Sequence, residues 1–233
     1  MKSLNLLDLF FPKICVGCKK FGSYLCKKCF MKLDFLNQDR CLNCLAPSHL
    51  GNTHKWCKKE ESLDGVLSLC GYNKTAQKIV FAVKYQLQYG IYEEVLSLVP
   101  EKITQKFIEF KNTVSNCCLQ TIPLHKKRRF LRGFNQSEML TNFFSKKLDL
   151  PIINIAKRIK NTTPQAYIKH KHERITNINK AFHIDKKQKL IYDTMILVDD
   201  VCTTSSTANE LAKELKKIGA KNVYLFSFAR GYR

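Results

Sequence analysis

The chain has 233 residues, of which 45% are hydrophobic and 25% are charged. These proportions exclude a disordered chain and are typical of one α/β domain of ordinary size with a small appendage. Lys and Arg number 40 against 19 Asp and Glu, and the net charge of +21 indicates a polyanionic partner. A coding bias towards Lys is the alternative explanation of this charge.

The start of the chain predicts neither a signal peptide nor a membrane span. The apolar stretch within residues 1–12 is short and interrupted, and no stretch reaches the roughly 20 apolar residues of a transmembrane helix. We expect a short amphipathic helix there that docks on the body of the protein. The protein is expected in the cytoplasm, with peripheral attachment at the cytoplasmic face of the inner membrane as an alternative.

Structural disulfides are rare in the cytoplasm, so the eleven Cys need another explanation. Six of the seven Cys between residues 15 and 57 form pairs with two residues between the partners, and such a pair presents two thiolates to one tetrahedral ion. Sequential pairing predicts a Cys₄ and a Cys₃His zinc site. The predicted ligands are Cys15, Cys18, Cys26 and Cys29 in the first site, and Cys41, Cys44, His54 and Cys57 in the second.

Two alternatives to this pairing stay open. A cross-braced arrangement would join the first Cys pair to the third, and His49 competes with His54 as a ligand. Residues 1–60 are therefore predicted to be a zinc-binding, zinc-ribbon-like module, and residues 61–233 the main domain. Of the remaining Cys, Cys70, Cys117 and Cys118 are expected in the core.

Strands and helices alternate in residues 61–233, which predicts an α/β fold with an open, mainly parallel sheet. The apolar patterns predict strands at 64–72, 118–123, 152–155, 195–198 and 222–228, and helices at 75–89, 101–110, 137–148 and 208–218.

Two stretches of this domain are strongly basic. Residues 125–132 follow a predicted strand, at the edge where α/β sheets bind ligands, and residues 154–189 hold ten basic residues against two acidic ones. We expect their cations to bind the phosphates of single-stranded DNA. The predicted DNA-binding residues are Arg129, Arg132, Lys157, Arg158 and Lys160, and Phe130, Phe134 and Tyr167 are weaker candidates for base stacking.

Residues 199–207 are the most informative segment of the chain. Asp199 and Asp200 end a buried strand, and five residues with hydroxyl side chains then lead into a helix. An anion site is formed by the first N–H groups of the helix, its dipole and the hydroxyls. The paired acids can bind vicinal hydroxyls or a hydrated Mg²⁺. A ribose 5-phosphate matches both halves. The alternative is an exposed acid pair before an ordinary capped helix.

This segment resembles the phosphoribosyl pyrophosphate loop of type I phosphoribosyltransferases, in which a strand leads into DD-x-x-TT-G-x-T. Ser205 stands where that pattern has Gly. Further motifs lie along the chain before this segment: the Cys pairs, Ile79-Val80-x-x-Val83-Lys84, Arg132-Gly133-Phe134-Asn135-Gln136, Thr163-Pro164-Gln165 and Arg174-x-x-Asn177. The last two lie within the basic stretch 154–189. The order of these motifs resembles that of the ComF family of competence proteins, and the RGFNQ run is quite specific to that family.

The resemblance implies a phosphoribosyltransferase-type fold behind a zinc module and a role in handling single-stranded DNA during natural transformation. Phosphoribosyl pyrophosphate, with Mg²⁺, is the expected ligand. Its predicted binding residues are Asp199, Asp200, Thr203, Thr204, Ser205, Ser206 and Thr207, with Lys126, Lys127 and Arg128 on the pyrophosphate. A DNA-translocating helicase or a strand-loading protein is the expected protein partner.

Two other functions stay open. The first is an active phosphoribosyltransferase, for which the sequence identifies neither catalytic residues nor an acceptor. The second is an interaction protein with a vestigial phosphate loop.

Overall fold

The computed structural model describes residues 12–86, 88, 90–163, 168, 170–185 and 189–231. Three predicted features lie outside these residues: the helix within residues 1–12, except for Pro12, the Pro164-Gln165 pair and the stacking candidate Tyr167. None of the helices in the described ranges combines the length and the apolar character that crossing a bilayer requires.

Four parallel strands form the central sheet, in the order β1-β6-β5-β2. They are β1 (Gly65–Gly71), β2 (Cys117–Thr121), β5 (Thr194–Cys202) and β6 (Asn222–Arg230). The predicted α/β class with an open, parallel sheet is confirmed. The strand predicted at 152–155 is reduced to one parallel bridge between Leu119 and Ile152, because the side chain of Asn154 accepts the N–H of Thr121.

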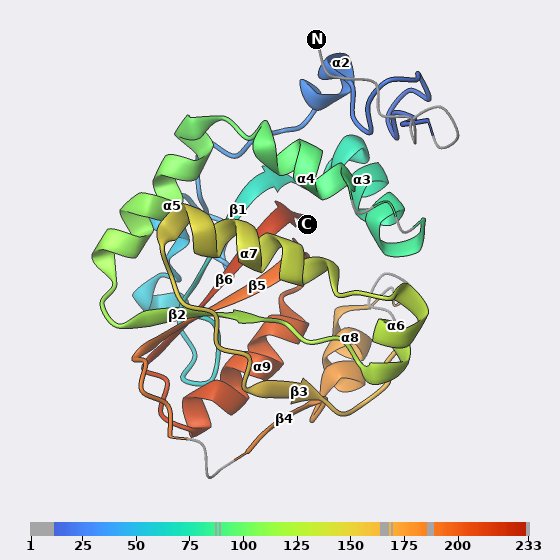
Figure 1. The fold of residues 1–233 in the computed structure, drawn as a ribbon. Helices are drawn as coiled ribbons and strands as arrows, with labels where there is room; N and C mark the ends of the chain where they lie inside the picture. Colours follow the sequence, from blue (N-terminus) through green and yellow to red (C-terminus); the bar gives the residue numbers. More distant parts are fainter. Residues whose placement is uncertain are drawn as a thin grey trace.

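Helices cover both faces of this sheet (Figure 1). Along β5, Ile196 and Val198 pack into one hydrophobic cluster, whereas Met195 and Leu197 pack into the other. The first face carries α3 (Lys74–Tyr85), α4 (Gly90–Ser97), α5 (Glu101–Thr113) and α7 (Gln136–Leu148). The second carries α8 (Lys171–Ile178), α9 (Ser206–Lys217) and the antiparallel pair β3 (Ala156–Arg158) and β4 (Phe182–Ile184).

Side-chain caps fix the start of two helices that border the carboxyl edge of the sheet. Asn73 accepts hydrogen bonds from the N–H groups of Thr75 and Ala76 at the start of α3, and Asn135 accepts one from Ser137 at the start of α7. A cap satisfies N–H groups that have no partner within the helix and contributes about 1 kcal/mol. Both helices therefore begin at defined residues at this edge of the sheet.

The cysteine-rich segment packs against the α/β body and contains α2 (Lys27–Phe30), η1 (His49–Gly51) and η2 (Lys55–Cys57). Leu25, Leu33 and Leu50 belong to the same hydrophobic cluster as α3 to α5. Glu94 of α4 accepts hydrogen bonds from the backbone N–H groups of Tyr24 and Leu25. The two predicted parts of the chain thus share one core.

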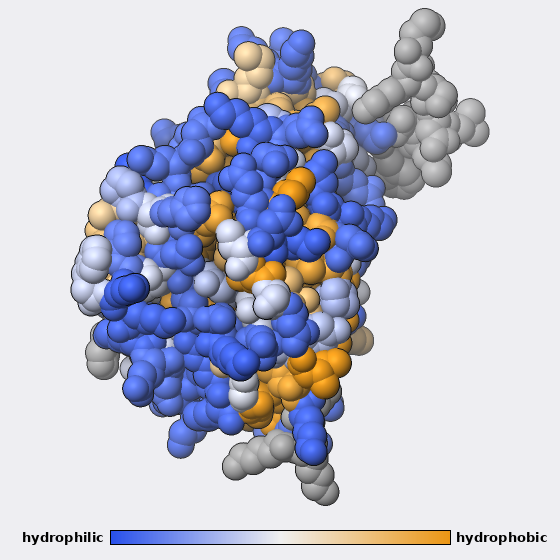
Figure 2. Space-filling view, turned by 90° about the vertical axis from the view of Figure 1, so that its left-hand side faces the viewer, coloured by the Kyte–Doolittle hydropathy of each residue, from blue (hydrophilic) through white to orange (hydrophobic). Residues whose placement is uncertain are grey.

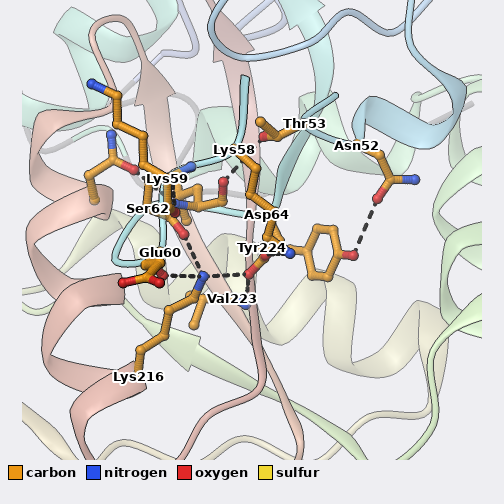
Figure 3. A network of polar contacts seen from close by, with 12 residues as sticks. Asn52, Thr53, Lys58, Lys59, Glu60, Ser62, Asp64, Lys216, Val223 and Tyr224 are labelled. Atoms are coloured by element: carbon orange, nitrogen blue, oxygen red, sulfur yellow. Dashed lines mark hydrogen bonds and ion pairs between the residues drawn. The ribbon is translucent and has the colours of Figure 1, made fainter. Parts of the chain in front are cut away.

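A buried carboxylate fixes the segment that follows the second predicted zinc site (Figure 3). Asp64 is 4% exposed, and its oxygens lie 2.5 Å from Lys58 Nζ and 2.9 Å from Lys216 Nζ. It also accepts the backbone N–H of Val223 at 2.8 Å. Residue 64 is thereby joined to α9 and to the start of β6, at the end of the sheet away from the acid pair.

The surface on the side of α5 is mainly hydrophilic, with apolar residues gathered in smaller patches (Figure 2). This agrees with a sheet that is already covered by helices on both faces.

Candidate functional site

A cavity of about 390 Å³ lies at the carboxyl end of β5, which is the ligand edge of open α/β sheets. One wall is formed by residues 199–208, from the end of β5 to the first turn of α9. The basic side chains that line it are Lys84, Arg128, Arg132, Arg158 and Arg174. The cavity has the volume of a small-molecule site and a surplus of positive charge, so it suits a small ligand with several negative charges.

The two acids of the cavity differ in their partners. Asp199 Oδ1 accepts hydrogen bonds from Ser137 Oγ at 3.0 Å and from the N–H of Asp200 at 2.9 Å. Asp200 is buried, and its Oδ2 lies 2.6 Å from Lys84 Nζ. Burial, together with repulsion by Asp200, raises the pKa of Asp199 to about 7, although Lys84 opposes this shift. Asp199 therefore changes charge near neutral pH.

The turn between β5 and α9 presents the hydroxyl groups. Ser205 has φ +56°, in the left-handed region, and makes no side-chain capping bond to α9. Thr204 Oγ1 and Ser206 Oγ lie 2.9 Å apart, and Arg174 Nη1 donates to Thr203 Oγ1 at 3.3 Å. An uncapped helix start with hydroxyls and a guanidinium beside it has the donors that a phosphate requires.

The basic residues 126–132 form a helix, α6 (Lys126–Arg132), which divides their side chains between two faces. Arg128 and Arg132, one turn apart, line the cavity. Lys126 and Lys127 instead lie with the exposed Phe130 and Leu131 around a shallow hollow on the other face. Of the three cations predicted on the pyrophosphate, the structure therefore places only Arg128 in the cavity.

Arg158 lies in the cavity although the sequence suggested a surface role on DNA. It is 9% exposed, and its Nη2 donates to Thr162 Oγ1 at 2.5 Å. Its Nε is buried without a hydrogen-bond partner among the residues that the structure describes. Burial, with repulsion by Arg128, lowers the pKa of Arg158 to about 10. A buried guanidinium without a carboxylate partner is costly and favours an anionic ligand.

The other predicted DNA-binding residues are divided in the same way. Arg132 lines the cavity, whereas Lys157 and Lys160 are exposed on and after β3, and Arg129 is exposed with Glu138 at 2.9 Å. Among the stacking candidates, Phe130 is 89% exposed, whereas Phe134 packs against the core.

Lys84 and Arg174 were not among the residues predicted to bind the ligand, yet both line the cavity. Lys84 lies four residues after Val80, on the buried face of α3. A cation within the apolar face of a helix is therefore the sequence signal that could have identified it. Arg174 lies on α8, a helix that the apolar pattern did not predict.

The structure brings together the four residues predicted for the first zinc site. The donor atoms of Cys15, Cys18, Cys26 and Cys29 all lie within 4.8 Å of one another. Cys18 Sγ and Cys26 Sγ are 3.7 Å apart, close to the roughly 3.8 Å between two thiolates of a tetrahedral zinc site with bonds of about 2.3 Å. The N–H of Cys26 donates to Cys15 Sγ at 3.3 Å, which favours the thiolate. This donor set fits zinc.

The second set is Cys41, Cys44, His54 and Cys57, whose donor atoms also lie within 4.8 Å of one another. His54 Nδ1 lies 3.3 Å from Cys44 Sγ, whereas Nε2 is 3.1 Å from the carbonyl oxygen of Pro47. A proton on Nε2 donated to this carbonyl leaves Nδ1 free for a metal. The arrangement is sequential rather than cross-braced, and His49 is not part of the cluster.

Comparisons with known proteins identify the N-terminal module and several relatives of the whole chain. Residues 6–60 match the double zinc ribbon domain family, so the chain carries an N-terminal zinc-binding module. Competence protein F of Haemophilus influenzae is 30% identical over 93% of the chain and 90% of that protein. Competence protein ComFC of Streptococcus pneumoniae is 27% identical over 89% of the chain and 88% of that protein. DNA utilization protein YhgH of Escherichia coli O157:H7 is 28% identical over 63% of the chain and 65% of that protein.

Proposed function

Because the chain belongs to the ComF family of competence proteins, we propose that it handles incoming single-stranded DNA during natural transformation and retains a site for phosphoribosyl pyrophosphate with Mg²⁺. One observation carries the ligand half of this proposal. The acid pair, the hydroxyl turn and the guanidiniums of Arg128 and Arg158 line the same cavity.

Each part of the ligand has a matching part of the cavity. The ribose hydroxyls donate to the acid pair, and the 5-phosphate accepts from the turn before α9. The pyrophosphate lies against Arg128 and Arg158, whose charges have no carboxylate partner in the described part of the cavity wall. Mg²⁺ neutralises the pyrophosphate, so the protein has to supply only part of the compensating charge.

Calorimetry with two ligands tests this arrangement. Arg128→Gln is expected to weaken the binding of phosphoribosyl pyrophosphate in Mg²⁺ at least tenfold, because a charge-assisted hydrogen bond is lost, and to affect ribose 5-phosphate much less. The double variant Lys126→Gln/Lys127→Gln removes two cations from the outer face of the same helix and is the matched control. Equal losses in both variants, or no binding by the wild type, would reject the proposed site.

The DNA half of the proposal rests on the cations outside the cavity. Lys126, Lys127 and Arg129 of α6 are exposed, as are Lys157 and Lys160. Arg128 joins α6 to the loop after β3 through a hydrogen bond to the carbonyl oxygen of Thr162. The two groups of cations therefore lie on neighbouring segments at the cavity, where they bind phosphates regardless of base sequence.

Fluorescence anisotropy with single-stranded oligonucleotides tests this surface. Affinity should fall steeply with salt, with a log–log slope of about −0.7 per phosphate neutralised. Lys157→Gln/Lys160→Gln should reduce the affinity and the slope, whereas Lys146→Gln/Lys147→Gln, an equal loss of charge at the end of α7, should have a smaller effect. Identical losses would indicate that net charge alone binds DNA. Arg158 is unsuitable for this test because it lines the cavity.

An active phosphoribosyltransferase is the alternative function. Loss of pyrophosphate would leave oxocarbenium character at C1 of the ribose. Arg128 and Arg158, which line the cavity, would stabilise the leaving group. Incubation with phosphoribosyl pyrophosphate, Mg²⁺ and candidate bases or nucleotides decides between the two, because only the enzyme releases pyrophosphate in proportion to an acceptor.

The proposal includes partners and a location. We expect a DNA-translocating helicase or a strand-loading protein to exchange the strand with this protein in the cytoplasm, or peripherally at the inner membrane. Co-purification from competent cells, with and without nuclease, tests whether such a contact depends on DNA.

A further inference from the structure

The side chain of Lys84 contacts the acid pair, Asp199 and Asp200, through Asp200. It belongs to the last turn of α3, and its Nζ is 2.6 Å from Asp200 Oδ2. The side chain of Lys84 is 21% exposed and that of Asp200 is 4% exposed, so water screens the contact little. Burial tends to lower the pKa of Lys84, but Asp200 and Asp199 raise it above its ordinary value. Lys84 is therefore an ammonium group at neutral pH.

Two neighbouring carboxylates normally need a cation between them or a shared proton, since both cannot ionise side by side without one. A divalent metal is one such cation. Here the distance between Lys84 Nζ and Asp200 Oδ2 is that of a charge-assisted hydrogen bond, so the ammonium already supplies this charge. Asp199 Oδ1 is held separately, by Ser137 and by the N–H of Asp200.

We propose that Lys84 takes the place of a divalent metal at the acid pair, holding Asp200 ionised and oriented so that the pair binds ribose hydroxyls without Mg²⁺. This inference rests on the proposed function, in which the cavity receives a ribose 5-phosphate group. Mg²⁺ then serves only the pyrophosphate part of the ligand. Lys84 is a positioning residue for Asp200 and leaves the 5-phosphate to the turn before α9.

The test uses ribose 5-phosphate, which has the hydroxyls and the 5-phosphate but no pyrophosphate. Calorimetry is done in buffer freed of metals by a chelating resin, with and without added Mg²⁺, and without EDTA, which would remove zinc from the ribbons. The wild-type protein should bind equally under both conditions. Lys84→Met should bind about tenfold more weakly without Mg²⁺ and recover in part when Mg²⁺ is added.

Two further variants serve as controls. Lys84→Arg keeps the positive charge and should retain binding that is independent of Mg²⁺. Lys74→Met removes an exposed lysine from the start of the same helix and should behave as the wild type. Partial rescue by Mg²⁺ is a readout that a merely structural role of Lys84 would not produce.

The outcomes separate this inference from the proposed function. If the wild type binds ribose 5-phosphate under neither condition, the ligand site itself is rejected. If it binds only with Mg²⁺, or if Lys84→Met matches the wild type, the site stands and the role of Lys84 is rejected. Should Lys84→Met fail to fold because Asp200 loses its partner, Lys84→Met/Asp200→Asn removes both charges. Its weakened binding should not recover with Mg²⁺, and recovery would overturn the inference.

Discussion

Arg230 Nη2 donates a hydrogen bond to the backbone carbonyl oxygen of Cys41 at 3.1 Å. Arg230 ends β6 and is 3% exposed, and the next residue, Gly231, donates its N–H to the carbonyl oxygen of Cys202 at 2.8 Å. The first predicted ligand of the second zinc site is thus joined to the strand end beside the hydroxyl turn. Loss of zinc from that site should therefore affect the α/β body.

Substitution of one exposed ligand tests this connection. Cys44→Ser should reduce the zinc content from two ions to one per chain and lower the melting temperature of the whole protein, because metal binding is coupled to folding. Mass spectrometry of the purified protein and calorimetric melting measure the two effects. Cys117→Ser, outside both clusters, is the control and should keep two zinc ions. Unchanged zinc content in Cys44→Ser would contradict the assignment.

The Asp64 network should be a large source of stability. Asp64→Asn leaves Lys216, whose side chain is 13% exposed, without its charged partner, and should lower the free energy of unfolding by about 3 kcal/mol. Asp193→Asn breaks a surface pair with Lys221, in which both side chains are more than 40% exposed, and should cost less than about 1 kcal/mol. Urea unfolding of both variants measures the two losses in free energy of unfolding. Equal losses would contradict a large contribution of the Asp64 network.

Most of the fold was predictable because the strands of the central sheet are short, mostly apolar runs between helical patterns. All residues of β1 and β2 are buried, as expected for a parallel sheet covered on both faces. The antiparallel pair of β3 and β4 was not predicted because each strand has only three residues, too few for a periodic signal. The helix predicted at 75–89 corresponds to α3, which ends at Tyr85, and α4, which begins at Gly90, was not predicted.

Apart from Arg128, the cavity-lining residues predicted to bind the ligand are the contiguous ones. Residues 199–207 carry a local pattern, and the structure brings them to one wall of the cavity. The cations come from α3, α6, β3 and α8, so their meeting depends on tertiary structure. Arg158 and Lys157 are neighbours in sequence, yet one lies in the cavity and the other faces the solvent, because successive side chains of a strand point to opposite faces.

Ser205 carries a backbone cost that a glycine would avoid. Its φ of +56° is unfavourable for a residue with a side chain, by about 1–2 kcal/mol. Ser205→Gly and Ser205→Ala both lose the contact of the hydroxyl with Cys202 Sγ, so their difference isolates the backbone. Urea unfolding should give the Gly variant a free energy of unfolding about 1 kcal/mol higher than that of the Ala variant, after allowance for the flexibility of Gly in the unfolded chain. Equal stability would mean that the turn relaxes in both.

The raised pKa of Asp199 predicts how stability depends on pH. Burial and repulsion by Asp200 raise this pKa to about 7, whereas Asp in an unfolded chain has a pKa of about 3.9. Between these values the folded state binds a proton that the unfolded state has lost. The contribution of Asp199 to stability therefore falls as the pH rises through this window, and it levels off above the folded pKa.

The Asp199→Asn variant has no titrating proton at this position, so its stability should not show the decrease with rising pH that Asp199 causes in the wild type. Urea unfolding of both proteins from about pH 5 to about pH 8 gives the difference in their free energies of unfolding, in which the other titrating groups cancel. The stability of the variant relative to the wild type should rise up to about pH 7 and level off above it, because Asp199 in the wild type must ionise beside Asp200. Parallel curves for the two proteins would mean that Asp199 is already ionised at pH 5. Lys84 would then neutralise both acids, and the unequal roles of Asp199 and Asp200 would have to be abandoned.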